Sequence, residues 1–160
     1  MSRSEPHILS STEQLQSWLE SAPRPLVFTN GCFDILHRGH VSYLERAAKL
    51  GTSLLVALNT DASVRRQGKG EDRPLNLLED RMAVIAALGC VDAVCSFDSD
   101  TPLELVMHCQ PNILVKGGDW PIEKIIGCNE VQSRGGQCFS IPFDFERSTT
   151  ALLNKIRKQS

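Results

Sequence analysis

Five short runs of apolar residues recur along the chain, and each is followed or preceded by a segment with helical periodicity. The runs are nearly continuous in apolar side chains, which is expected for strands of a parallel sheet covered on both faces. Strands that alternate with helices in this way predict an α/β fold, here a Rossmann-like doubly wound sheet of about five mainly parallel strands with helices on both faces. The predicted strands cover residues 25–30, 53–59, 92–97, 112–117 and 137–143.

The segments around these runs carry signals for helix ends. The helix predicted at 148–159 begins at a Ser/Thr cap and ends in cationic residues, which suits the helix dipole. The polar, glycine-bearing segment 65–74 is predicted to be a mobile loop. We divide the chain into an N-terminal helical extension, residues 1–23, and a main domain, residues 24–160. The other predicted helices cover residues 11–22, 39–51, 76–89 and 101–110.

Composition excludes several classes of protein. The chain has 160 residues, 41% of them hydrophobic, so a core of ordinary size is expected without disulfides. The net charge of −2 argues against a nucleic-acid partner, because nucleic-acid-binding domains usually carry a basic face. The six cysteines show no CxxC pair or zinc spacing, and we interpret them as reduced thiols. No apolar run approaches the roughly 18 residues of a membrane span, so we expect no membrane insertion and a cytoplasmic protein.

The stretch NGCFDILHRGH, residues 30–40, follows the first apolar run and opens a predicted helix. In parallel α/β sheets, ligands bind outside the carboxyl ends of the strands. Gly31 lets the backbone turn close to a ligand, and Gly39 leaves space above the amides of the helix N-terminus, which attract phosphate. His37 and His40, three residues apart, face the same way on a first helical turn and suit a phosphate whose charge grows during a reaction.

Two other interpretations of the histidine pair stay open at this point. The pair can be two unrelated surface or core histidines. It can also hold zinc, although zinc ligands on one helix face usually follow an HxxxH spacing with a third ligand elsewhere. The position between a strand and a helix favours nucleotide binding over both.

Three later stretches add candidate residues. Asn59 and Asp61 follow the second apolar run and are expected in the same cleft, although Asp61 also fits a helix N-cap. The segment VKGGDW, residues 115–120, ends a strand with two glycines that permit close approach to a nucleobase or ribose. Its Trp120 packs on a ligand or belongs to the core. The segment RSTT, residues 147–150, opens the last helix and combines capping with a second anion site.

The motif GCFDILHRGH resembles the signature of the HxGH nucleotidyltransferase superfamily. Further stretches follow in order, and together residues 24 to 158 resemble the heptose 1-phosphate adenylyltransferases. The main domain, residues 24–160, is accordingly interpreted as a nucleotidyltransferase domain. The stretches that carry this resemblance are LNTDASVRR, GKGEDRPLNLLEDRMAVIAAL, VDAVCSF, DTPLELV, ILVKGGDW and RSTTALL.

The resemblance implies an activity and its partners. AMP is transferred from ATP to D-glycero-D-manno-heptose 1-phosphate, which gives ADP-heptose and pyrophosphate for the lipopolysaccharide inner core. Mg²⁺ is implied as the cofactor that accompanies ATP, with no metal ligands in the protein. The implied partners are ATP and a sugar 1-phosphate, a second copy in a homodimer, and a heptose kinase on a separate chain.

The resemblance also assigns roles to residues. The implied catalytic residues are His37, His40 and Lys69, the last by similarity to glycerol-phosphate cytidylyltransferases. Asp34 equally fits a helix-entry cap, and a helical arginine such as Arg81 is usually a surface ion-pair partner. The implied substrate-binding residues are Asp34, Asn59, Asp61 and Arg81. The implied nucleotide-binding residues are Thr29, Asn30, Gly31, Cys32, Phe33, Gly39, Lys116, Gly118, Asp119, Trp120, Ser148, Thr149 and Thr150.

Three alternative functions are compared with this one. A cytidylyltransferase acting on glycerol 3-phosphate or another polyol phosphate uses the same chemistry, but such relatives carry an arginine where this chain has Phe143. A non-catalytic nucleotide sensor is disfavoured because His37 and His40 are both present. An RNA-binding synthetase-like fragment is disfavoured by the acidic balance and by the lack of a KMSKS-like loop.

Overall fold

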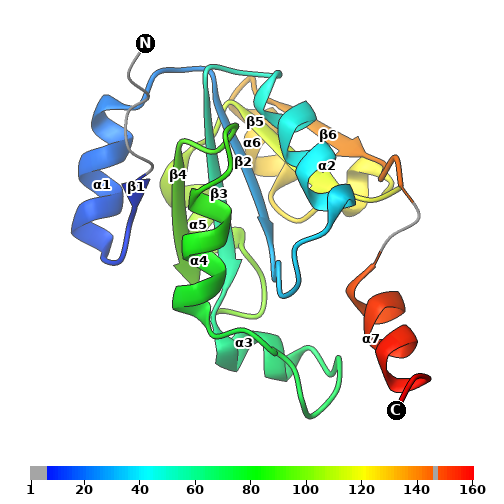
Figure 1. Ribbon diagram of the computed structural model, residues 1–160. Coiled ribbons are helices and arrows are strands. Elements are labelled where there is room, and N and C mark those ends of the chain that lie inside the picture. The colour runs from blue at the N-terminus through cyan, green and yellow to red at the C-terminus, as the bar shows by residue number, and fades with distance from the viewer. Residues whose placement is uncertain (1–6, 146–147) are drawn as a thin grey trace.

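The computed structural model describes residues 7–145 and 148–160, and its centre is one parallel sheet with helices on both faces (Figure 1). The Rossmann-like doubly wound prediction is therefore confirmed. The sheet has six strands in the order β1-β4-β3-β2-β5-β6, one more than predicted. The strands are β1 (His7–Ile8), β2 (Leu26–Gly31), β3 (Ser53–Asn59), β4 (Ala93–Phe97), β5 (Ile113–Gly117) and β6 (Gln137–Ile141).

All five predicted helices are present, with ends that differ by a few residues. Two further short helices, α3 and α6, and a 3₁₀ turn, η1, are not predicted, because six residues or fewer are too short to show a helical period. The helices are α1 (Thr12–Ser21), α2 (Arg38–Ala48), α3 (Asp61–Arg66), α4 (Leu78–Ala86), α5 (Leu103–Cys109), α6 (Cys128–Ser133) and α7 (Thr149–Arg157), with η1 at Ile122–Lys124. None of the helices in the described part of the chain is long and apolar enough to cross a membrane.

The core consists of two apolar layers, one on each face of the sheet. On one face Leu15 of α1, Val106 of α5 and Val131 of α6 pack on alternate side chains of the strands. On the other face Leu44 of α2 and Ile85 of α4 do the same. Figure 1 shows α2 and α4 in front of the sheet and α5 and α6 behind it. Burial of both faces explains why the central strands read as continuous apolar runs.

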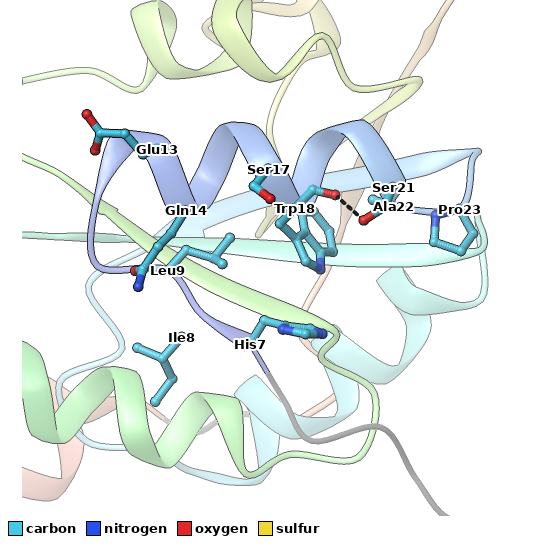
Figure 2. A pocket seen from close by; sticks show the side chains of 10 residues that line it. All are labelled: His7, Ile8, Leu9, Glu13, Gln14, Ser17, Trp18, Ser21, Ala22 and Pro23. Carbon is cyan, nitrogen blue, oxygen red and sulfur yellow. Dashed lines mark hydrogen bonds between the residues drawn. The ribbon is translucent and has the colours of Figure 1, made fainter.

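The N-terminal segment belongs to the sheet as well as to the predicted helical extension. Strand β1 pairs in parallel with β4, with His7 opposite Ala93, and Leu9 is buried in the core. A pocket lies between β1 and α1, where Trp18 points toward His7 (Figure 2). The part of the predicted extension at residues 1–6 lies outside the described residues, and the boundary after residue 23 stays a prediction.

The order of the strands sets the position of the ligand site. Strand β2 lies between β3 and β5, so the chain leaves β2 toward one side of the sheet and later returns to its other side. A crevice forms at such a switch point, outside the carboxyl ends of the strands. The segments after Gly31, Asn59 and Gly117 meet there.

Candidate active site

The two histidines form the N-terminal turn of α2. His37 is the N-cap residue, and its Nδ1 accepts a hydrogen bond from the backbone N–H of Gly39 at 3.1 Å. The Nδ1 atom of His40 accepts from the backbone N–H of His37 at 3.3 Å. The two rings stack with their centroids 3.9 Å apart. Because both Nδ1 atoms are acceptors, each neutral imidazole carries its proton on Nε2.

His40 is neutral at physiological pH. Burial, together with the nearby His37 and Lys69, lowers its pKa to about 4. A neutral imidazole whose Nδ1 is already occupied can still donate from Nε2. His40 is therefore a fixed hydrogen-bond donor, suited to an oxygen atom that gains negative charge.

This pKa predicts how stability depends on pH. The folded pKa of His40, about 4, lies below its ordinary value of 6.5, so below pH 6.5 the unfolded chain binds a proton that the folded chain does not. We expect the free energy of unfolding to fall as pH falls from 6.5 toward 4. Chemical denaturation at pH 7.5 and pH 5 measures this, and the decrease should be smaller in His40→Asn. An equal decrease in the variant would contradict the assignment.

Two lysines reach the site from different elements. The Nζ atom of Lys69, in the loop after α3, lies 3.6 Å from the sulfur of Cys32 at the end of β2. Lys116, near the end of β5, is half-buried. Burial lowers its pKa, and the charge of Lys69 lowers it further, while Cys32 opposes this. A ligand that brings negative charge between these two lysines is therefore favoured, as a polyphosphate does.

The glycine pair at the end of β5, Gly117 and Gly118, lies close to two aromatic side chains. Gly118 has a φ of +107°, which side chains rarely adopt, and a Cβ there would lie 3.0 Å from the indole nitrogen of Trp120. A Cβ at Gly117 would lie 3.1 Å from the ring of Phe143. Trp120 is 48% exposed, which excludes a simple core role, and Lys116 lies 5.6 Å from its ring centroid. The segment therefore offers an open aromatic surface beside a cation.

Phe143 connects this surface to the histidines. Its ring packs edge-on against His40, with centroids 6.3 Å apart, and against Tyr43 at 5.8 Å. The ring is 43% exposed, so part of it stays accessible beside His40. The sequence singles out Phe143 only as a departure from cytidylyltransferases, and nothing in the local pattern predicts its contact with His40.

Arg81 is buried among the segments that follow β2 and β3. Its side chain is completely buried, and its guanidinium donates to the carbonyl oxygens of Cys32, Asn59 and Asn76 at 2.8, 2.9 and 3.0 Å. It also pairs with Asp61 at 2.7 Å. One arginine therefore joins the loops after β2 and β3 to the start of α4. The predicted substrate contact is replaced by a structural one, because no surface of the guanidinium is accessible.

Asp34 is likewise buried, and its side chain is fully covered. Its carboxylate accepts from the Nε of Arg73 at 2.6 Å and from the backbone N–H groups of Leu75 and Asn76. Burial raises the pKa of this carboxyl, but hydrogen bonds from Asn76, Leu75 and Arg73 outweigh it and hold the pKa below its usual range. The predicted roles as a substrate contact or a helix-entry cap are both corrected, since the carboxylate binds the loop before α4.

Several other predicted ligands also have structural partners. The Thr29 hydroxyl is buried between the Tyr43 hydroxyl and the carbonyl oxygen of Val115, so the predicted contact of Thr29 with a nucleotide would have to use its backbone. Asn59 is buried and donates to the hydroxyl of Ser63 at 3.0 Å. The N-cap of α3 is Thr60, so Asp61 is the partner of Arg81 and not the cap.

The remaining predicted nucleotide ligands lie around the crevice. Phe33, at a φ of +48°, is buried and packs against His40. Asn30 lines a small pocket together with Lys116 and Trp120, and Asp119 is exposed beside them. A Cβ on Gly31 or Gly39 would lie 2.9 Å from the ring of Phe33 or His37, respectively, so a side chain at either position would displace that ring.

The start of α7 lies beside the histidine loop. Ser148 caps the helix by accepting from the backbone N–H of Ala151, and Thr149 donates to the carbonyl oxygen of Ile35 at 3.3 Å. Thr150 lines a pocket together with Lys69 and Arg73. Arg147 of the RSTT segment lies outside the described residues. The C-terminal segment is thus brought to the same crevice from the far end of the chain.

Sequence reasoning missed Arg73 and Gln67. Arg73 is 6% exposed although its neighbours in the chain are polar, and Gln67 accepts from the thiol of Cys32 at 3.6 Å. Both follow α3 in the segment predicted to be mobile. A polar segment gives no local signal that one of its arginines is buried.

These features define the class of protein. A doubly wound sheet, a histidine pair at a helix N-terminus and two lysines near the switch point are an arrangement suited to phosphate-bearing ligands. A sequence model of the cytidylyltransferase-like family matches residues 28–138. The chain belongs to this family.

Individual relatives within this family show which of its members the chain resembles. The chain is 64% identical over 136 residues to the D-beta-D-heptose 1-phosphate adenylyltransferase of Bordetella bronchiseptica, covering 85% of this chain and 84% of that protein. It is 53% identical to the bifunctional protein HldE of Pseudomonas syringae over 84% of this chain, which spans 28% of that longer protein. Its fold is similar to a lipopolysaccharide core biosynthesis protein from Thermoplasma volcanium, with a TM-score of 0.61, 27% identity, and coverage of 76% of this chain and 98% of that one.

Proposed function

We propose that the protein transfers AMP from ATP to D-glycero-D-manno-heptose 1-phosphate and releases ADP-heptose and pyrophosphate. The observation that carries this proposal is the histidine pair on α2, whose Nδ1 atoms are occupied, beside Lys69 and Lys116. The substrate assignment is supported by the 64% identity to the heptose 1-phosphate adenylyltransferase of Bordetella bronchiseptica.

The proposed reaction is a single in-line displacement. An oxygen of the sugar phosphate forms a bond to the α-phosphorus of ATP, and the bond from that phosphorus to the bridging oxygen of pyrophosphate breaks. Charge builds up on the oxygens around the α-phosphorus, where the Nε2–H of His40 is a suitable donor. Lys69 and Lys116 hold the triphosphate and the departing pyrophosphate. Trp120 and the backbone at Gly118 hold the nucleoside.

We propose that Mg²⁺ enters with ATP, held by phosphate oxygens and water. Among the described residues, no group of three or more His, Cys, Asp or Glu side chains is placed to hold a metal ion. Asp34 and Asp61 are committed to Arg73 and Arg81. Such a donor set suits magnesium, which often binds through substrate phosphates. The ion would neutralise charge on the phosphates.

The setting of the reaction is also a proposal. We place it in the cytoplasm because ATP is the donor, and we propose that a separate heptose kinase supplies the sugar phosphate. The homodimer stays a prediction that sedimentation of the purified chain can test.

The direct test is pyrophosphate release with Mg²⁺ and ATP, with and without D-glycero-D-manno-heptose 1-phosphate, each anomer in a separate reaction. CTP with glycerol 3-phosphate forms the parallel arm. We expect release only with ATP and one heptose 1-phosphate anomer. Release with CTP and glycerol 3-phosphate instead would establish the cytidylyltransferase alternative. No release with any pair would support the nucleotide-sensing alternative.

A further inference from the structure

The loop that carries Lys69, residues 67–77, is attached to the rest of the protein by two ion pairs of different character. Arg73 pairs with Asp34 at 2.6 Å, and their side chains are 6% and 0% exposed. Asp72 pairs with Arg157 of α7 at 2.7 Å, and these side chains are 51% and 60% exposed. The adjacent loop residues Arg73 and Asp72 therefore attach the loop at two places, one inside the protein and one in solvent.

The buried attachment is reinforced by the backbone. Both oxygens of Asp34 accept from the N–H of Leu75, and one also accepts from the N–H of Asn76 at 2.9 Å. The side-chain amide of Asn76 donates back to the carbonyl oxygen of Asp34 at 2.6 Å. Charge-assisted hydrogen bonds with buried partners hold geometry tightly, whereas exposed ion pairs contribute little.

This attachment joins the lysine loop to the histidine segment. Asp34 lies between Cys32 and His37 in the chain, so its carboxylate ties residues 73–76 to the segment that leads into α2. Lys69 is only four residues from Arg73, and its Nζ reaches the sulfur of Cys32 at 3.6 Å. The position of the lysine above the crevice therefore depends on where Arg73 is anchored.

We propose that Arg73 is a positioning residue for the nucleotidyl transfer, which acts by holding Lys69 against the β2–α2 segment through Asp34. The effect on the rate of nucleotidyl transfer rests on the proposed function. Arg73 itself does not touch substrate, because its guanidinium is buried against Asp34. The exposed Asp72–Arg157 pair does not share this role.

The kinetic test compares single and double variants in the pyrophosphate-release assay. Displacement of a catalytic group by about 1 Å can cost roughly 10²-fold in rate, so we expect Arg73→Met to lower kcat by up to about that factor. Arg73→Lys, which keeps the charge, should recover part of the rate. In a Lys69→Met background, Arg73→Met should change kcat by less than about twofold, because the lysine through which it acts is gone.

The matched control is Arg157→Gln, which removes the exposed ion pair on the same loop. We expect its kcat to stay within about twofold of the unmodified protein. If Arg73→Met lowers kcat by the same factor with and without Lys69, Arg73 does not act through that lysine and the proposal is overturned. An equal loss in Arg157→Gln would overturn it as well.

A second readout does not depend on activity. Lys69 is exposed, and trypsin cuts after it faster when the loop around it is more mobile, so cleavage there should be faster in Arg73→Met and in Asp34→Asn, and unchanged in Arg157→Gln. Unchanged cleavage in both buried-pair variants would overturn the anchoring. If Arg73→Met does not fold, the kinetic and proteolysis measurements are made on Arg73→Lys and Asp34→Asn instead. If the unmodified protein releases no pyrophosphate, the proposed function fails, and proteolysis still decides whether Arg73 anchors the loop.

Discussion

Replacement of His40 by alanine is expected to lower kcat for pyrophosphate release by about 10²–10³-fold, the usual cost of removing one donor to a developing charge. The Nδ1 of His40 is occupied by the backbone N–H of His37, which leaves the proton on Nε2 as the donor that the proposed reaction requires. The ring is neutral because its pKa is about 4, so the same donor operates across the neutral pH range. Steady-state kinetics with saturating ATP and heptose 1-phosphate measures the loss.

Two comparisons show whether the loss is specific to His40 and whether it arises in the transition state. His108 is exposed on α5, and His108→Ala should leave kcat unchanged. The KM for ATP should change little in His40→Ala if the interaction forms mainly in the transition state. A loss confined to KM would show instead that His40 binds the ground state, and an unchanged kcat would remove it from the mechanism.

The second large effect concerns stability. Arg81→Met should lower the free energy of unfolding by about 3–5 kcal/mol, the typical cost of removing one partner of a buried ion pair. The substitution leaves the carbonyl oxygens of Cys32, Asn59 and Asn76 without their donor and Asp61 without its counter-charge. Denaturation in urea at pH 7 measures the change.

The matched control is Arg66→Met on the surface. Arg66 pairs with Asp100 at 2.9 Å, but the two side chains are 45% and 81% exposed, and such pairs contribute about 0–1 kcal/mol. A similar loss of unfolding free energy in both variants would mean that burial of Arg81 does not increase its contribution to stability. Activity of Arg81→Met near that of the unmodified protein would contradict the view that Arg81 holds the loops of the crevice in place.

Most of the fold could be predicted because its signals are local. A continuous apolar run and a capped helical period each lie within one short window, and the strands from β2 to β6 and five helices were found in this way. Strand β1 has two residues, too few for a pattern, and its pairing with β4 joins residues that are far apart in the chain. The sheet therefore has one strand more than its local signals indicate.

The same difference between local and distant signals applies to the candidate site. The sequence by itself determined where the candidate site lies, because strands of one direction bring their carboxyl ends to one edge, and the motif with His37 and His40 follows such a strand. Only the tertiary structure decided what each residue does there. Asp34 and Arg73 meet across 39 positions, and Arg81 reaches Cys32 across 49. Whether a charged side chain faces a ligand or is buried against a partner depends on these distant contacts, which no local pattern encodes.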